Sequence, residues 1–165
     1  MRLAEGDIAL RAFGPDDEAT LLAMLSEPEV ARWWPVPDFQ RDAGWIIEVD
    51  GEPSGWLEYH EEDYAWYPSV AFDIMLTSSL HGHGYGRRVL RLAISHFVAK
   101  GHHRFTLDPN VANERAIRSY GAVGFERVGV MRAYERSPHG GFHDALLMEL
   151  IVPEAIERDA LAPRP

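Results

Sequence analysis

The sequence predicts an α/β fold in one domain, with a mixed central sheet of about six to seven strands flanked by about four helices. Short apolar or alternating runs, typical of strands, are interleaved with runs of helical spacing. The 165 residues are 46% hydrophobic and 25% charged, which suffices for a single buried core. We see neither an internal repeat nor an interdomain linker. Residues 1–165 are therefore expected to form one domain, with the last few residues as a flexible tail.

In the first half of the chain, proline and glycine residues mark the ends of the expected strands and helices. In order, they are a strand at 8–13 (IALRAF), a helix between Pro15 and Pro28, a short segment (EVARWW) that stops at Pro35 and Pro37, a hairpin at 44–62 around the turn Asp50-Gly51, and a strand at 69–76 (SVAFDIML). The last of these strands is the most continuously apolar, so we expect it at the centre of the sheet.

The second half begins with an amphipathic helix of about 14 residues, which Lys100 and Gly101 end. A strand at 103–108, a helix capped by Asn113, strands at 125–132 and 142–151, and a loop at 138–141 complete the chain.

Several function classes are disfavoured by composition. The chain has no cysteine, which rules out disulfides, thiolate metal sites and a cysteine nucleophile. Its histidine pairs, such as His81 with His83 and His139 with His143, lack the spacing of a metal motif, so we predict no metal. Neither an 18-residue apolar run nor a signal-peptide core is present. We expect a soluble cytoplasmic protein.

Charge is distributed unevenly along the chain. Residues 1–80 hold 17 acidic and 4 basic side chains, whereas residues 81–140 hold 4 acidic and 10 basic ones. Nucleic acid is a poor partner for the acidic half. The asymmetry favours a bipartite site, with one part for an anion and the other for a cation, over chance clustering of surface charges.

The basic region opens on a glycine-rich stretch, SSLHGHGYGRR, placed between a predicted strand and a predicted helix. Unpaired N–H groups and the helix dipole make such a junction an anion site, and glycines allow close backbone approach. The spacing of Gly82, Gly84 and Gly86 matches neither the dinucleotide fingerprint nor a Walker loop. Taken alone, the stretch could equally be a tight structural turn.

Together with the segment DPNVANERAIRSYGAVGFERVGV, this loop resembles the GCN5-related N-acetyltransferase family over nearly the whole chain. In that family the loop R/Q-x-x-G-x-G/A binds the pyrophosphate of acetyl-CoA through backbone N–H groups. The matching positions are His81, Gly82, His83, Gly84, Tyr85 and Gly86. His81 departs from the family's Gln or Arg. Arg87 and Arg88 would add positive charge near the phosphates.

Within the family, the closer resemblance is to aminoglycoside 6′-N-acetyltransferases. It rests on the stretches EVARWW, DGEPSGWLEY, DYAWYPSVAFDIML, TLDPNVANERAIRSYGAVGFERVGV and HDALLMELI. The resemblance implies acetyl transfer from acetyl-CoA to an amine of a polycationic small molecule, and with it an association with antibiotic resistance.

Two acids are the main candidates for holding the reacting amine. Acetyl transfer requires a neutral amine, so a carboxylate must bind the ammonium and accept its proton. Asp73 lies inside an apolar strand, where an unpaired carboxylate is costly, and the resemblance places an amine-binding acid there. Asp108 is the second candidate. The alternatives are an outward-facing Asp73 and a turn role for Asp108 in DPN.

The same resemblance assigns further positions. Tyr120 would act as general acid at the CoA sulfur, although it could be a core aromatic. Asn113 would touch the pantetheine, although it could also serve as a helix cap, and Ala116 would belong to the cofactor-binding residues. A backbone N–H at Ile74–Leu76 would meet the developing oxyanion.

The remaining candidates are aromatic and acidic side chains for the acceptor, since aromatic faces pack on sugars and cations. They are Trp33, Trp34, Asp63, Tyr64, Trp66 and Asp144.

The sequence thus predicts an acetyl-CoA-dependent N-acetyltransferase acting on a cationic small molecule, with an aminoglycoside as the first expectation. An acetyltransferase for protein N-termini or polyamine-like metabolites stays open, as does a non-catalytic acyl-CoA-binding module. We expect neither nucleic acid nor membrane as a partner, and the sequence does not predict the oligomeric state.

Overall fold

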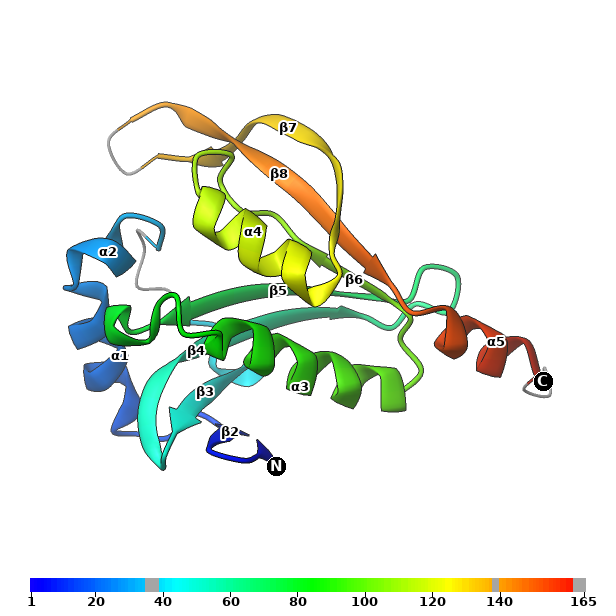
Figure 1. Ribbon diagram of the computed structural model, residues 1–165, viewed down its shortest axis with the longest axis horizontal. Coiled ribbons are helices and arrows are strands. Elements are labelled where there is room, and N and C mark those ends of the chain that lie inside the picture. The colour runs from blue at the N-terminus through cyan, green and yellow to red at the C-terminus, as the bar shows by residue number, and fades with distance from the viewer. Residues whose placement is uncertain (35–38, 138–139, 162–165) are drawn as a thin grey trace.

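The computed structural model describes residues 1–34, 39–137 and 140–161. The described residues form eight strands in one mixed sheet, in the order β1-β2-β3-β4-β5-β6-β8-β7, and five α-helices (Figure 1). The strands are β1 (Arg2–Glu5), β2 (Ile8–Arg11), β3 (Gly44–Val49), β4 (Glu52–Glu62), β5 (Ser69–Leu76), β6 (Arg104–Leu107), β7 (Glu126–Arg136) and β8 (Phe142–Ile151). The helices are α1 (Asp17–Leu25), α2 (Pro28–Ala31), α3 (Tyr85–Ala99), α4 (Glu114–Val123) and α5 (Pro153–Leu161).

This architecture confirms the predicted α/β fold and its mixed sheet. Only β5 and β6 run parallel, and the other neighbouring strands are antiparallel. β5 and β8 have the predicted bounds, and Asn113 caps α4. The strand count is higher than predicted because β1 pairs with β2 as a short hairpin, and α5 was not anticipated. Pro35, Pro37, part of the 138–141 loop and residues 162–165 lie outside the described residues.

Apolar side chains cover both faces of the sheet. The larger core lies between the sheet and the helices α3 and α4, which pack side by side (Figure 1). Val89, Leu90 and Phe97 of α3 are buried there, as their helical spacing predicted. A smaller core joins α1 and α2 to the opposite face around Trp56 and Met75. Alternate residues of β5 therefore face different helices, and Asp73 shares the face of Met75. None of the described helices is both long enough and apolar enough to cross a membrane.

A charged network fastens α1 to the sheet. Arg11 donates to Glu48 Oε1 at 2.6 Å and to both carboxylate oxygens of Asp17 at 2.6 and 2.7 Å. Both carboxylates are buried. The Arg11 hydrogen bond holds the pKa of Asp17 below its ordinary value, so this stabilisation is present above that ordinary value and is lost as the pH falls through the lowered pKa.

We expect Arg11→Met to lower the free energy of unfolding at pH 7 by about 3 kcal/mol, because it leaves the buried Asp17 carboxylate without its cation and leaves Glu48 with Arg2 alone. Urea denaturation measures the change. Arg118→Ala is the control, since it removes an exposed ion pair with Glu114 and should cost less than about 0.5 kcal/mol. Equal losses in the two variants would contradict a special role for the buried network.

Candidate active site

The central feature of the site is a wedge-shaped gap, here called the wedge, between the two parallel strands β5 and β6. β5 and β6 pair only at Val70 with Phe105 and at Ala71 with Thr106. β4 follows β5 as far as Leu76, and β8 follows β6 along its length. Among the described residues, β5 beyond Ala71 therefore has no strand neighbour on its β6 side. A sequence pattern cannot reveal such a separation, because both strands read as ordinary apolar runs.

The wedge leaves backbone groups of β5 free to bind a ligand. Thr77 N–H donates to Ser54 O at 2.9 Å, so the hydrogen bonds between β4 and β5 involve Thr77, Met75 and Asp73. Because backbone groups alternate in direction along a strand, the N–H groups of Ile74 and Leu76 point toward the wedge. They are placed to donate hydrogen bonds to a carbonyl oxygen of a reacting group, or of an amide-bearing ligand, that lies between the strands.

Around the wedge lies a cleft of about 850 Å³. One part is lined by the glycine loop, the start of α3 and α4, including Arg87, Arg115 and Arg118. The other part is lined by residues of α2, β5, β7 and the chain after β6, including the acids Glu29, Asp73, Asp108 and Glu135. The acidic part also includes the bases Arg32 and Arg136. The cleft thus combines an arginine-lined region with a carboxylate-rich one, although Asp108 and Glu135 come from the basic segment of the sequence and not from its acidic half.

The glycine loop is an open turn at the start of α3. Gly82 has φ 79° and Gly84, the N-cap of α3, has φ 85°, both in the left-handed region that favours glycine. Arg87 lines the cleft. Arg88 does not add the charge expected of it, because its guanidinium is paired with Asp7. The side chain of Tyr85 is also engaged with Asp7.

The histidine at the start of the loop binds the backbone of β5. Nε2 of His81 lies 2.9 Å from the carbonyl oxygen of Leu76. A carbonyl only accepts, so Nε2 carries the proton. Burial lowers the pKa of His81, which favours the neutral ring. His81 and Gly82 line the cleft, whereas His83 lies outside the cleft lining. His81, which stands where the family has Gln or Arg, therefore connects the glycine loop to β5.

Asp73 lies at the centre of the acidic region. Burial, and then the charges of Asp108, Glu58 and Glu135, raise the pKa of Asp73 to about 7. Glu58 faces Asp73 across the β4–β5 pair. Asp73 is thus not an outward-facing residue, and its proton affinity suits exchange near neutral pH.

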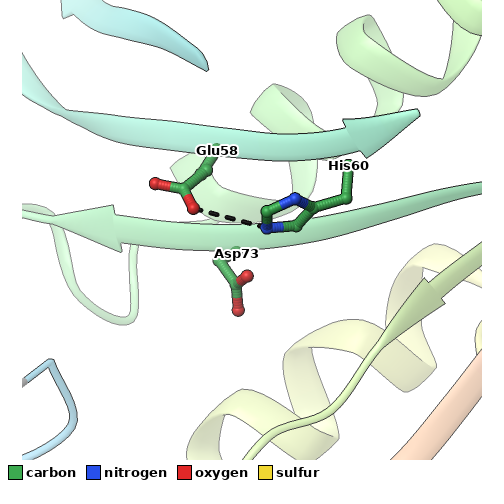
Figure 2. A group of neighbouring side chains, drawn as sticks. All are labelled: Glu58, His60 and Asp73. Carbon is green, nitrogen blue, oxygen red and sulfur yellow. Dashed lines mark ion pairs between the residues drawn. The ribbon is translucent and has the colours of Figure 1, made fainter. Parts of the chain in front are cut away.

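Figure 2 shows Glu58 and His60 of β4 beside Asp73 of β5. His60 Nε2 lies 3.4 Å from Glu58 Oε1, and one ligating atom of each of the three residues lies within 4.8 Å of the others. Glu58 also accepts hydrogen bonds from Trp56 Nε1 and Gln40 N–H. We interpret the group as two carboxylates beside a histidine, held in part by the hydrogen bonds to Glu58, and assign it no metal.

Asp108 and Tyr120 both interact electrostatically with Asp73. Asp108 follows β6 and accepts a hydrogen bond from the Tyr134 side chain. Tyr120 of α4 lines the cleft, and burial followed by the charges of Asp73 and Asp108 raises its pKa. Tyr120 is therefore protonated at neutral pH. Asn113 Oδ1 accepts from Ala116 N–H at 3.2 Å, so its cap role is real, and both residues also line the cleft.

The predicted acceptor residues divide into two groups. Trp33 and Trp34, which follow α2, line the cleft beside the acids. The exposed loop between β4 and β5 carries the residues of the second group, and they do not line this cleft: Asp63, Tyr64 and Trp66. Asp144 is also absent from the lining, because its carboxylate accepts a hydrogen bond from Ala133 N–H.

Some residues in or beside the cleft escaped sequence reasoning. Glu58 could have been suspected, since it interrupts the apolar run GWLEY as Asp73 interrupts its own strand. Tyr134 and Glu135 carry no such signal, because their position depends on an irregularity in β7. Arg115 was hidden in an ordinary helix pattern.

Comparison with known proteins agrees with the family resemblance that the sequence indicates. Residues 15–125, more than half of the chain, match the model of the acetyltransferase (GNAT) family. No curated protein matches the sequence. Among solved structures, the aminoglycoside acetyltransferase AAC(6′)-Ib in complex with coenzyme A is 24% identical, with a TM-score of 0.70 over 93% of this chain and 99% of the other.

Two further solved structures share the fold, and one of them is a protein acetyltransferase. RimL, a ribosomal L7/L12 α-N-protein acetyltransferase, is 18% identical with a TM-score of 0.79, over 92% of this chain and 98% of its own. RimJ from Mycobacterium smegmatis is 21% identical with a TM-score of 0.78, over 97% of this chain and 92% of its own. These likenesses concern the fold, whereas the family match covers the wedge, the glycine loop and α4. The chain belongs to the acetyltransferase (GNAT) family.

Proposed function

We propose that this protein transfers the acetyl group of acetyl-CoA directly to an amine of a polycationic small molecule, specifically the 6′-amine of an aminoglycoside. The observation that carries the proposal is the division of one cleft into an amide-rich, arginine-lined region and a carboxylate-rich region that meet at the wedge. Membership of the family supplies acetyl-CoA as co-substrate and acetyl transfer as the reaction.

The residues of the first region fit acetyl-CoA. Left-handed Gly82 and Gly84 bring bare backbone to the start of α3, where unpaired N–H groups attract a diphosphate. Arg87 adds a cation at the same place. The free N–H groups of Ile74 and Leu76 would hold the carrier chain and meet the carbonyl oxygen as it gains negative charge. Acetyl-CoA supplies the activated acetyl group.

Asp73 would act as the general base. Its pKa of about 7 allows it to take a proton from an ammonium, directly or through water, at neutral pH. Tyr120 is protonated and lines the cleft, so it would return a proton to the leaving sulfur. Asp108 and Glu135 would bind further ammonium groups, with Trp33 and Trp34 packing on the acceptor.

The chief alternative is an acetyltransferase for protein N-termini, supported by the similarity in fold to RimL. A peptide N-terminus presents one ammonium at the reacting position. The grouping of Asp108, Glu135 and Glu29 with Asp73 along the cleft favours an acceptor with several. The number of carboxylates therefore supports a polycation over a peptide.

Release of free CoA thiol from acetyl-CoA tests the proposal. The acceptors are kanamycin-like aminoglycosides, spermidine and short peptides. We expect release with aminoglycosides, with the highest kcat/KM in the panel. Turnover of peptides alone would overturn the aminoglycoside proposal in favour of N-terminal acetylation. Binding of acetyl-CoA without release with any amine would indicate a non-catalytic module.

A further inference from the structure

β7 contains an irregularity beside the cleft. Between the pairs Met131–Ala145 and Glu135–His143, β7 advances four residues while β8 advances two. Ala133, within this bulge, has φ 48°, a left-handed conformation that is costly for a residue with a Cβ. Such bulges turn a side chain away from the regular alternation of a strand. A strained non-glycine residue at this position requires a compensating contact.

Asp144 of β8 provides that contact. The Ala133 N–H, which the bulge removes from the strand pairing, donates to Asp144 Oδ1 at 2.8 Å. Asp144 lies between the two β8 residues that flank the bulge in the pairing, Ala145 and His143. A hydrogen bond to a carboxylate is stronger than one between neutral groups. The anchor therefore connects the strained peptide to the neighbouring strand.

The next residue, Tyr134, carries the effect into the cleft. Its hydroxyl binds Asp108, and this hydrogen bond is the main cause that raises the pKa of Tyr134 to about 12. Tyr134 lines the cleft together with Asp108 and Glu135, yet 52% of its surface is exposed. One end of the side chain is thus fixed on a carboxylate of the cleft, while much of the side chain remains accessible.

We propose that Asp144 is a positioning residue that holds the β7 bulge so that Tyr134 orients the Asp108 carboxylate as a second ammonium-binding group beside Asp73. The inference rests on the proposed function and specifies it: the acceptor carries at least two ammonium groups, one at Asp73 and one at Asp108. Asp144 acts through Ala133 and Tyr134 and does not touch the acceptor.

Two substitutions at Asp144 separate the contribution of its hydrogen-bond-accepting oxygen from that of its negative charge. Asp144→Ala removes the accepting oxygen, whereas Asp144→Asn retains one in nearly the same shape. Amide hydrogen exchange at Ala133, followed by NMR, measures the anchor without any substrate. We expect slow exchange in the native protein and in Asp144→Asn, and faster exchange in Asp144→Ala. Fast exchange in the native protein would overturn the anchor.

Steady-state kinetics with an aminoglycoside measures the consequence for the site. Asp144→Ala and Tyr134→Phe should each raise the KM for the aminoglycoside about tenfold, as expected for losing the orientation of a charged partner. The KM for acetyl-CoA should change less than about twofold, and Asp144→Asn should restore most of the affinity for the aminoglycoside. The double variant Tyr134→Phe/Asp144→Ala should be no worse than Asp144→Ala alone, because both changes act on one chain of contacts.

The outcomes distinguish this inference from the proposed function. An unchanged aminoglycoside KM in Asp144→Ala, with lost protection at Ala133, would overturn the positioning role while leaving acetyl transfer intact. Multiplying effects in the double variant would also overturn it. Absence of turnover with every aminoglycoside in the native protein would overturn both the proposed function and the positioning role, and the Ala133 exchange data would still report on the anchor itself.

Discussion

Asp73→Asn is expected to lower kcat by about 10²- to 10⁴-fold while leaving the affinity for acetyl-CoA near its native value. The substituted amide keeps the shape of the carboxylate but cannot accept the ammonium proton. In the native protein, kcat/KM should rise with pH through about 7 as Asp73 loses its proton, and this limb should vanish in the variant. Thiol release at pH 5.5–8.5 and calorimetric titration with CoA measure the two effects.

The same substitution should stabilise the protein at high pH. Asp73 has its pKa raised in the folded state from 3.8 to about 7, so the fold loses stability as the pH rises through that interval. Replacing the carboxylate should add up to about 4 kcal/mol to the free energy of unfolding at pH 8 and little at pH 4. Urea denaturation at the two pH values provides the comparison.

Asp63→Asn is the matched control, because Asp63 is an exposed acid outside the cleft lining. It should leave kcat, the pH profile and stability within experimental error of the native protein. If Asp73→Asn weakens CoA binding as much as it lowers kcat, Asp73 is a structural residue and the general-base assignment fails.

Gly84→Ala is expected to raise the Kd for CoA at least tenfold. Gly84 has φ 85°, and a Cβ there would lie 3.1 Å from Nη2 of Arg87. The end of the Arg87 side chain must therefore move, and the left-handed backbone that presents the N–H groups is strained, at the place proposed for the diphosphate. Calorimetric titration with CoA measures the change without any acceptor.

A second glycine provides a close control for this variant. Gly51, in the turn between β3 and β4, has φ 84°, and a Cβ there would have no described neighbour within 4 Å. Gly51→Ala should impose the same backbone cost, about 1–2 kcal/mol of stability, without affecting CoA. Equal CoA affinity in Gly84→Ala and Gly51→Ala would remove the assignment of the glycine loop to a phosphate.

Local sequence signals were sufficient for most of the fold. β5 and β8 had the expected bounds because their apolar runs end at clear breaks, and α3 ended at Lys100 and Gly101 as expected. β1 was missed because it has only four residues, none of them buried, and therefore carries little apolar signal. Its pairing with β2 depends on the turn at Gly6.

The site was less accessible to sequence reasoning, since it depends on the separation of strands. The resemblance placed Asp73, Asp108 and Tyr120 on positions that the fold gathers around the wedge. It also suggested Asp144, whose contact in the structure is with the β7 backbone. Tyr134 reaches Asp108 only because of the bulge at Ala133, and nothing in the local residue pattern announces a left-handed alanine.

The parting of β5 and β6 has a thermodynamic consequence. The N–H groups of Ile74 and Leu76, which a regular sheet would pair with a neighbouring strand, hydrogen-bond to solvent instead. The unliganded protein therefore lacks the stabilisation of this stretch of β-ladder. A linear amide-bearing molecule bound there would pair with β5 as a strand does and would complete the sheet. Because such a molecule would bind the folded state and not the unfolded one, its binding would raise the free energy of unfolding.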